Sequence, residues 1–233
     1  MSNTNKKHPI QTIADREQEN IHKIRTEADV KLRMDRIHED FEQGFDKLRQ
    51  EQDTITFFGS ARLDPSDEYY KKARHLAERI VQELGATVVT GGGSGIMAAA
   101  NQGAKDSNGK SIGVTIELPC EQVTNQYVDE SVDFYYFFSR KVALSFTARA
   151  FIYFPGGFGT LDEFFEILTL KQTGKIKPLP MILYGRDFWT PLLEFINETL
   201  AKEFKTIGKE DCDLFHLTDS ADEVLEILNG KDK

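Results

Sequence analysis

Cysteine is scarce in this sequence: only Cys120 and Cys212 occur among its 233 residues, and they lie far apart. Two cysteines exclude a disulfide framework and a four-cysteine zinc site. The five histidines show neither the H-x-H nor the H-E-x-x-H spacing of a zinc enzyme. The sequence also lacks a G-x-S-x-G nucleophile elbow, and neither glycine-rich loop is directly followed by Gly-Lys-Ser/Thr as in a Walker A loop. We expect neither a metal ion nor a bound cofactor.

The sequence also has no excess of positive charge and no long apolar run. The chain carries 29 Lys and Arg against 38 Asp and Glu, a formal net charge of −9, and no basic tract. We therefore expect no nucleic-acid partner and no membrane partner, and any phosphate must be held locally by backbone N–H groups and a few cations. No run of about 18 apolar residues occurs, and the N-terminus does not read as a signal peptide. With so little cysteine, we expect a cytoplasmic protein.

The beginning of the chain differs from the rest, and we predict a helical extension over residues 1–50 and one nucleotide-binding catalytic domain over residues 51–233. We expect residues 1–13 to be disordered. Residues 14–52 are dense in charge, and their apolar side chains recur at steps of three and four, which predicts one long or two shorter amphipathic helices. That face either packs on the chain's own domain or builds an interface between subunits. Its positions are Ile21, Ile24, Ala28, Leu32, Ile37, Phe41, Phe45 and Leu48.

From residue 54 onward, short apolar runs alternate with segments of helical periodicity. The alternation predicts a parallel sheet with helices on both faces, which is an α/β, Rossmann-like, doubly wound fold. Ligands of such sheets bind at the carboxyl ends of the strands, where the strand order reverses. The predicted strands are Thr54–Phe58, Thr87–Thr90, Ser111–Ile116, Val132–Phe138, Ala150–Phe154, Pro180–Tyr184 and Phe215–Thr218. The predicted helices are residues 67–84, Ile96–Lys105, Arg140–Arg149, Leu161–Gln172, Phe188–Phe204 and Ala221–Leu228.

A glycine-rich loop after the apolar strand at Ala150–Phe154 gives the clearest sign of a ligand. It reads Pro-Gly-Gly-Phe-Gly-Thr over residues 155–160 and runs directly into a helix. Glycines let the backbone approach an anion closely, and the amides at a helix start favour phosphate. A tight turn that binds nothing is the alternative. The residues predicted to bind the phosphate are Gly156, Gly157, Gly159 and Thr160.

A second glycine-rich loop, residues 90–98, follows the next predicted strand. Its G-x-G-x-x-A spacing loosely matches a dinucleotide fingerprint, with Glu117 about twenty residues on as a partner for a ribose. That fingerprint normally follows the first strand of a unit, and close packing of a small-residue helix on the sheet would explain the same residues. We predict that the loop serves the other side of one ligand. The residues assigned to it are Gly92, Gly93, Ser94 and Gly95.

Two shorter segments also put hydroxyls or cations at strand ends. Gly59 and Ser60 follow the first predicted strand, and Arg140 and Lys141 follow the fourth. Two cations at a helix start oppose the helix dipole, which makes sense if an anion binds there. A solvated surface pair is the plain alternative. We predict that Gly59, Ser60 and Lys141 contact the substrate.

Two carboxylates, Asp162 and Glu163, stand in the first turn of the helix after the phosphate loop. Helix-start electrostatics alone would explain both. The functional interpretation is that a carboxylate one turn from a bound 5′-phosphate reaches the ribose. Cleavage of an N-glycosidic bond builds positive charge on the sugar, which a carboxylate stabilises while it orients or deprotonates a water.

Three segments together resemble the LOG ("lonely guy") family: residues 91–97, Arg140-Lys141, and Pro-Gly-Gly-Phe-Gly-Thr-Leu-Asp-Glu at residues 155–163. The resemblance covers about residues 52–230. Members of this family are cytokinin riboside 5′-monophosphate phosphoribohydrolases, long labelled lysine decarboxylases. The resemblance implies a Rossmann-like fold and hydrolysis of AMP or an N6-substituted AMP to free base and ribose 5-phosphate.

The resemblance also assigns roles to residues. The catalytic pair of the family would fall on Arg140 and Glu163, and Asp162 would lie beside the nucleoside 5′-monophosphate substrate. It implies a homo-oligomer, a dimer or larger, in which neighbouring subunits often shape the site. This chain departs from the family at Phe138-Ser139, where many members read His-Glu, and at Leu144, where many carry Met. Both departures bear on base specificity and leave the pair intact.

Two other functions stay open at this point. The first is a non-catalytic protein that binds a nucleotide or carries a phosphorylated cofactor, and the retained Arg140 and Glu163 argue against it. The second is an amino-acid decarboxylase, which would need pyridoxal phosphate on a Schiff-base lysine. Lys141 is the only lysine near the predicted site, and no partner for the pyridinium nitrogen is evident.

Overall fold

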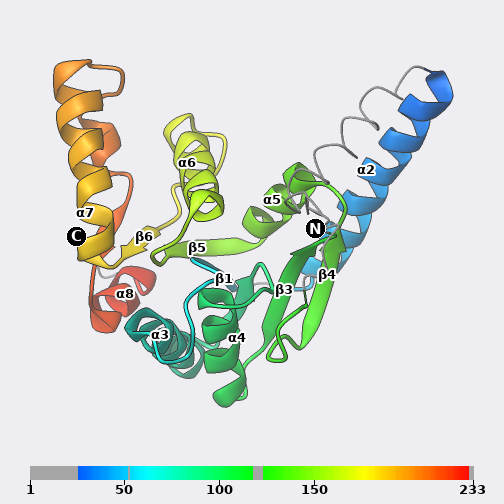
Figure 1. Cartoon of the computed structure of the whole chain (residues 1–233), viewed down its shortest axis with the longest axis horizontal. Helices are drawn as coiled ribbons and strands as arrows, with labels where there is room; N and C mark the ends of the chain where they lie inside the picture. Colours follow the sequence, from blue (N-terminus) through cyan, green and yellow to red (C-terminus); the bar gives the residue numbers. More distant parts are fainter. Residues whose placement is uncertain (1–25, 52, 118–122, 231–233) are drawn as a thin grey trace, which may run out of the picture.

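The computed structural model describes residues 26–51, 53–117 and 123–230, so the disorder expected for residues 1–13 lies outside the described residues. The chain forms one seven-stranded parallel sheet in the order β4-β3-β2-β1-β5-β6-β7 (Figure 1). This confirms the predicted α/β, Rossmann-like fold. The strands are β1 (Thr54–Phe58), β2 (Thr87–Thr90), β3 (Ser111–Ile116), β4 (Glu130–Phe134), β5 (Ala148–Tyr153), β6 (Met181–Tyr184) and β7 (His216–Thr218).

Helices cover both faces of this sheet, as continuous apolar strands require. On one face, α3, α4 and α8 pack on side chains such as Ile55 and Ile152; on the other, α2, α5, α6 and α7 pack on side chains such as Phe151 and Val114 (Figure 1). The helices are α2 (Glu27–Leu48), α3 (Glu68–Leu84), α4 (Ile96–Asp106), α5 (Phe137–Phe146), α6 (Phe158–Gln172), α7 (Arg186–Glu194), the π-helix η1 (Phe195–Glu203), the 3-10 helix η2 (Glu210–Asp213) and α8 (Ala221–Leu228).

The strand order reverses at β1, which lies between β2 and β5. Thr54 pairs with Thr87 on one side and with Ala148 on the other. The loops that leave β1 and β5 therefore part to opposite sides of the sheet and open a crevice at the carboxyl ends of the strands. Backbone hydrogen bonds join these loops, because the amide of Ser60 donates to the carbonyl of Pro155 at 2.9 Å.

Several predicted boundaries were wrong. The helix predicted over Arg140–Arg149 spans Phe137–Phe146, and β5 already begins at Ala148. Two of the shifted boundaries concern the site. β4 ends at Phe134 and α5 begins at Phe137, whereas the aromatic run predicted a strand that continues to residue 138. A carboxylate on α2 binds the amides that follow β4, which is a tertiary contact that local propensity does not show. The helix predicted to start at Leu161 starts at Phe158, because the glycine-rich loop already adopts helical geometry there.

The described part of the extension, from residue 26 onward, forms the long helix α2, which starts at a capping box formed by Thr26 and Asp29. Its second half packs against α5 and β4 (Figure 1). Gly44 allows this close approach, since a Cβ there would lie 2.4 Å from Cζ of Phe134. The predicted apolar face of this helix is only partly buried: Leu48 is fully buried, whereas Leu32 remains 69% exposed.

Candidate active site

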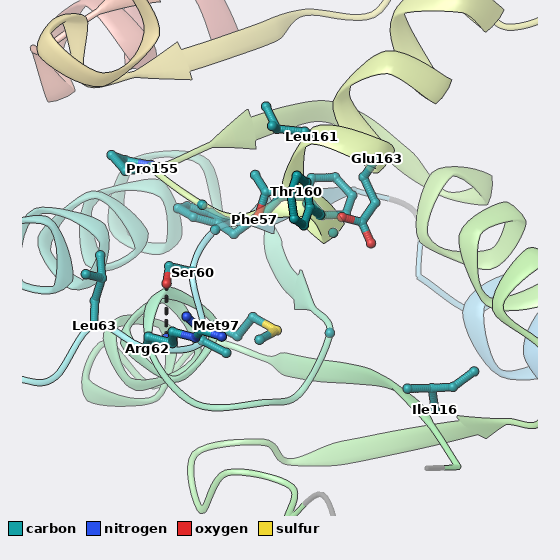
Figure 2. Close-up of a pocket in the computed structure, with 18 of the residues that line it drawn as sticks. Phe57, Ser60, Arg62, Leu63, Met97, Ile116, Pro155, Thr160, Leu161 and Glu163 are labelled. Atoms are coloured by element: carbon teal, nitrogen blue, oxygen red, sulfur yellow. Dashed lines mark hydrogen bonds between the residues drawn. The ribbon is translucent and has the colours of Figure 1, made fainter. Parts of the chain in front are cut away.

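A cavity of about 1000 Å³ opens at the crevice between β1 and β5. Its walls come from the loop after β1, the glycine-rich loop after β5, the start of α6 and the start of α5. Figure 2 shows Thr160 at the start of α6 and Glu163 further along the same helix, across the cavity from Ser60, Arg62 and Met97. The residues predicted from sequence that line it are Gly59, Ser60, Arg140, Gly156, Gly157, Gly159, Thr160 and Glu163.

The glycine-rich loop presents the N-terminus of α6 to this cavity. No side chain of the described residues caps the helix, and its first hydrogen bond is the one that Leu161 donates to the carbonyl of Gly157 at 3.1 Å. The amides of Phe158, Gly159 and Thr160 therefore precede the first helical hydrogen bond and are available for an anion. Phe158 itself is 93% exposed, so its side chain is not packed over these amides.

Glycine is required at position 156 by the close approach of Thr160. A Cβ on Gly156 would lie 2.2 Å from the Thr160 hydroxyl oxygen, so any larger residue would displace that side chain. Within the described part of the chain, no atom lies within 4 Å of a Cβ built on Gly157. The loop thus leaves open space on one side and is tightly packed on the other, as a phosphate cradle requires.

Arg140 is a buried cation at the start of α5. Its Nε donates to the carbonyl of Val114 at 2.8 Å, and its Nη1 lies 3.9 Å from Oε1 of Glu163. A Cβ on Gly91 would come within 2.3 Å of its Nη2, so the first glycine of the second loop makes room for the guanidinium. Burial lowers the pKa of Arg140 while Glu163 raises it, and a guanidinium stays protonated in proteins.

Glu163 lies in the second turn of α6 and not in the first turn as predicted, because the helix starts at Phe158 instead of Leu161. Its side chain is only 15% exposed. Burial raises its pKa from the ordinary 4.5 to about 7, although the neighbouring Arg140 acts in the opposite direction. Desolvation therefore outweighs the attraction between the two charges. A carboxyl group with a pKa near neutrality, beside a fixed cation in a cavity, is suited to exchange a proton during catalysis.

Most of the second glycine-rich loop lies behind the cavity wall. Gly91 and Met97 line the cavity, but the four residues predicted there, Gly92, Gly93, Ser94 and Gly95, do not. Asn125 binds the carbonyls of Gly92 and Gly93, and the Ser94 hydroxyl donates to the carbonyl of Ala61. A Cβ on Gly95 would lie 2.1 Å from the carbonyl oxygen of Ser60. This loop supports the loop after β1.

Lys141 and Asp162 also lie outside the cavity lining. The Lys141 ammonium pairs with Asp162 and with Glu166, each at 3.1 Å. This ion-paired lysine is not placed to form a Schiff base with a ligand in the cavity. The two ion pairs connect α5 to α6, the helices that carry Arg140 and Glu163.

Several lining residues were not among the predicted site residues. Gly91 stands directly after β2, a position that could have marked it, and Arg62 is the cation of the loop after β1. The apolar side chains of the cavity wall could not be predicted from the sequence, because they come from separate elements and follow no common spacing. This wall includes Phe57, Met97, Ile116, Phe137 and Phe188.

Within residues 26–51, 53–117 and 123–230, no three His, Cys, Asp or Glu side chains gather in a way that could hold a metal ion. None of the helices in these ranges is both long and apolar enough to cross a membrane.

Comparison with known families supports the resemblance seen in the sequence. The family model described as "Possible lysine decarboxylase" matches residues 97–228. A cytokinin riboside 5′-monophosphate phosphoribohydrolase of Oryza sativa subsp. japonica is 34% identical over 138 residues, and one of Arabidopsis thaliana is 30% identical over 138 residues. Each alignment covers 58% of this chain; they cover 57% and 64% of those relatives, which is less than two thirds of their length.

Solved structures share the fold at lower identity. The molybdenum cofactor binding protein of Rippkaea orientalis superposes with a TM-score of 0.58 at 24% identity, over 77% of this chain and 97% of that protein. The molybdenum cofactor carrier protein of Chlamydomonas reinhardtii gives a TM-score of 0.56 at 21% identity, over 77% and 97%. At these identities the likeness concerns the arrangement of the sheet and helices.

Proposed function

This chain belongs to the family described as possible lysine decarboxylase, the LOG family, and from that premise we propose that it is a nucleoside 5′-monophosphate phosphoribohydrolase. Its substrate would be AMP or an N6-substituted AMP of the cytokinin type, and its products the free base and ribose 5-phosphate. One observation carries the proposal: Glu163 and Arg140 face each other at 3.9 Å in a cavity whose wall is the uncapped start of α6.

In the proposed complex the 5′-phosphate binds at the amides of Phe158, Gly159 and Thr160. Those amides carry the partial positive charge of the helix N-terminus, which suits a phosphate in a chain with a net charge of −9. Glu163 follows one turn later on the same helix, within reach of the ribose of a nucleotide anchored at its phosphate. The apolar wall around Met97, Ile116 and Phe137 would hold the base.

Hydrolysis then breaks the bond between C1′ and the base nitrogen, which takes the electron pair. Positive charge develops at C1′, and the Glu163 carboxylate stabilises it and accepts a proton from the attacking water. The water oxygen becomes the hydroxyl on C1′. The departing base takes up a proton from solvent, and Glu163 releases to solvent the proton that it accepted from the water. Arg140 offsets the negative charge of the phosphate and carboxylate, so that both are tolerated in one buried site.

The test is product release by the purified chain. Incubation with AMP and with isopentenyl-AMP should yield free base and ribose 5-phosphate, measured by liquid chromatography. Glu163→Gln should lower kcat by about 10²–10⁴-fold, the range usual for a proton-transferring group, and should retain nucleotide binding in calorimetry.

The matched control is Glu166→Gln, which removes a carboxylate one turn further along the same helix. Glu166 pairs with Lys141 and does not line the cavity, so its loss should leave kcat within a few-fold of the wild type. Turnover that survives Glu163→Gln, or that falls equally in both variants, would remove the basis for the proposal.

A carrier that binds a phosphorylated cofactor without turnover is the second candidate. The cavity volume of about 1000 Å³ favours it, because this is at the upper end of the range for small-molecule sites and leaves room beyond AMP. The same experiment separates the two functions: saturable binding of nucleotide or of a larger phosphorylated ligand, with no base released from any nucleotide, would establish the carrier.

A further inference from the structure

α2 carries a buried acidic residue for which the proposed reaction has no direct use. Asp40 is 7% exposed, and with Gly44 and Leu48 it forms the stripe of α2 that is buried. Burial of a carboxylate is costly unless donors replace its water. Asp40 lies on the extension, outside residues 97–228, which match the family model.

The donors to this carboxylate come from the segment that leads into α5. The amide of Tyr135 donates to Oδ1 of Asp40 at 3.0 Å, and the amide of Tyr136 donates to Oδ2 at 3.0 Å. The Ser139 hydroxyl also hydrogen-bonds to Oδ2. Asp40 thus binds two successive backbone amides and a side chain from the first turn of the helix.

These contacts take the place of a helix cap. The N-cap residue of α5 is Tyr136, and it provides no side-chain cap. Asp40 supplies the negative charge that a helix N-terminus favours, from a different helix and with both oxygens occupied. It also stops β4 at Phe134, since the amides of Tyr135 and Tyr136 are turned toward α2 instead of toward a strand.

The residue directly after Ser139 is Arg140. Its amide closes the first turn of α5 by donating to the carbonyl of Tyr136 at 3.2 Å, so its position follows that of the capped segment. Its side chain has little freedom to compensate, because the guanidinium is confined between Gly91, the Val114 carbonyl and Glu163. A displaced first turn would move the guanidinium relative to Glu163.

We propose that Asp40 is a positioning residue, which fixes the start of α5 and thereby holds Arg140 against Glu163; the kinetic consequence rests on the proposed function. Through the Asp40 side chain, the extension then supports the site without touching the substrate. Asp40→Asn is the informative substitution. Asparagine keeps the shape of the side chain but replaces one carboxylate oxygen with an NH2 group, so that one of the amide or hydroxyl donors loses its acceptor.

The first test is kinetic. Asp40→Asn should lower kcat at least about tenfold, as expected for a misplaced catalytic group, with KM for AMP within about threefold because the phosphate loop is untouched. Asp35→Asn is the matched control: it removes the same charge from an exposed position on α2 and should leave both constants unchanged.

A double variant distinguishes positioning from general damage. If Asp40 acts through Arg140, Asp40→Asn should lower the residual rate of the Arg140→Ala variant by less than about twofold. Loss of the same factor in both backgrounds would overturn the proposal, as would an unchanged kcat in the single variant. Thermal melts of all variants, with assays well below the lowest melting temperature, exclude unfolding as the cause.

A second measurement needs no activity. Phenylglyoxal modifies accessible guanidinium groups, and peptide mass spectrometry reads each arginine separately. The buried Arg140 should react slowly in the wild type relative to the exposed Arg62, and several-fold faster in Asp40→Asn but not in Asp35→Asn. If the wild type releases no base, the proposed function fails while this readout still decides the positioning role: equal labelling of Arg140 in all three proteins would refute it.

Discussion

Glu163→Gln should make the folded protein more stable above neutral pH and leave it almost unchanged at pH 5. Burial raises the pKa of Glu163 from 4.5 to about 7, so between these values the folded chain keeps a proton that the unfolded chain has released. Stability then falls as the pH rises through this window, because the native state binds more protons than the unfolded state. Below pH 4.5 Glu163 is protonated in both states and does not reduce the stability. Above pH 7 it is ionised in both states, and the full cost of burying its charge applies.

The size of the penalty follows from the two pKa values. At about 1.4 kcal/mol per pK unit, the interval from 4.5 to about 7 corresponds to about 3 kcal/mol. The side chain is only 15% exposed, so solvent screening reduces this little. Glutamine mimics the protonated form and removes the cost of ionisation. We expect a gain of about 2–3 kcal/mol at pH 8.5 and under about 1 kcal/mol at pH 5.

Trp189 provides the assay. It is the only tryptophan of the chain and is fully buried, so its fluorescence should shift to longer wavelength on unfolding. Urea titrations of wild type and variant at pH 5 and pH 8.5 give the two differences in free energy of unfolding. With a slope of about 2 kcal/mol per molar urea, the midpoint at pH 8.5 should rise by roughly 1 M.

Glu166→Gln serves as the control here too. It breaks the ion pair with Lys141, so it should give no gain in stability at pH 8.5. An equal gain from Glu163→Gln at both pH values would show that the effect does not come from ionisation, and the reasoning from burial would be refuted. If the expected result is found, the variant that loses turnover is also the more stable one, as expected when a buried charge is kept for catalysis.

Two further predictions concern Gly91, which lies beside Arg140, and Leu48, which anchors α2. Gly91→Ala places a Cβ 2.3 Å from Nη2 of Arg140, so kcat should fall at least about tenfold while product inhibition by ribose 5-phosphate stays the same; an unchanged kcat would contradict the placement of Arg140. Leu48→Ala removes a fully buried side chain of α2, and urea unfolding should show a loss of about 2–4 kcal/mol; a loss below about 0.5 kcal/mol would mean that α2 is not part of the cooperative unit.

Much of the sheet could be predicted because its strands are continuous apolar runs bounded by glycine or polar residues. The strands Thr54–Phe58, Thr87–Thr90 and Ser111–Ile116 have the predicted bounds, and so does the helix Ala221–Leu228. In these segments the local pattern and the tertiary environment agree, so pattern alone suffices. The glycine-rich loop at residues 155–160 was recognisable for the same reason, since it follows a buried strand and starts a helix.

The remainder depends on contacts between distant parts of the chain. The aromatic run from Phe134 to Phe138 has the composition of a strand, yet it turns into α5 because Asp40 binds its amides. The glycines after β2 resemble a ligand loop, but Gly95 is small because it packs on the backbone of Ser60. No local pattern distinguishes a glycine that makes room for a ligand from one that makes room for the protein itself.

The central place of β1 has a consequence for how the site arises during synthesis. Thr54 pairs with Thr87 early in the chain, but its other partner, Ala148, and the start of α6 are made much later. Contacts between residues so distant in sequence form slowly, because the entropy of closing a long loop is lost before the contacts can stabilise the fold. A nascent chain that has completed β1 and β2 therefore holds only half of its crevice. A ligand that needs both sides of the crevice cannot stabilise the fold until the start of α6 has been synthesised.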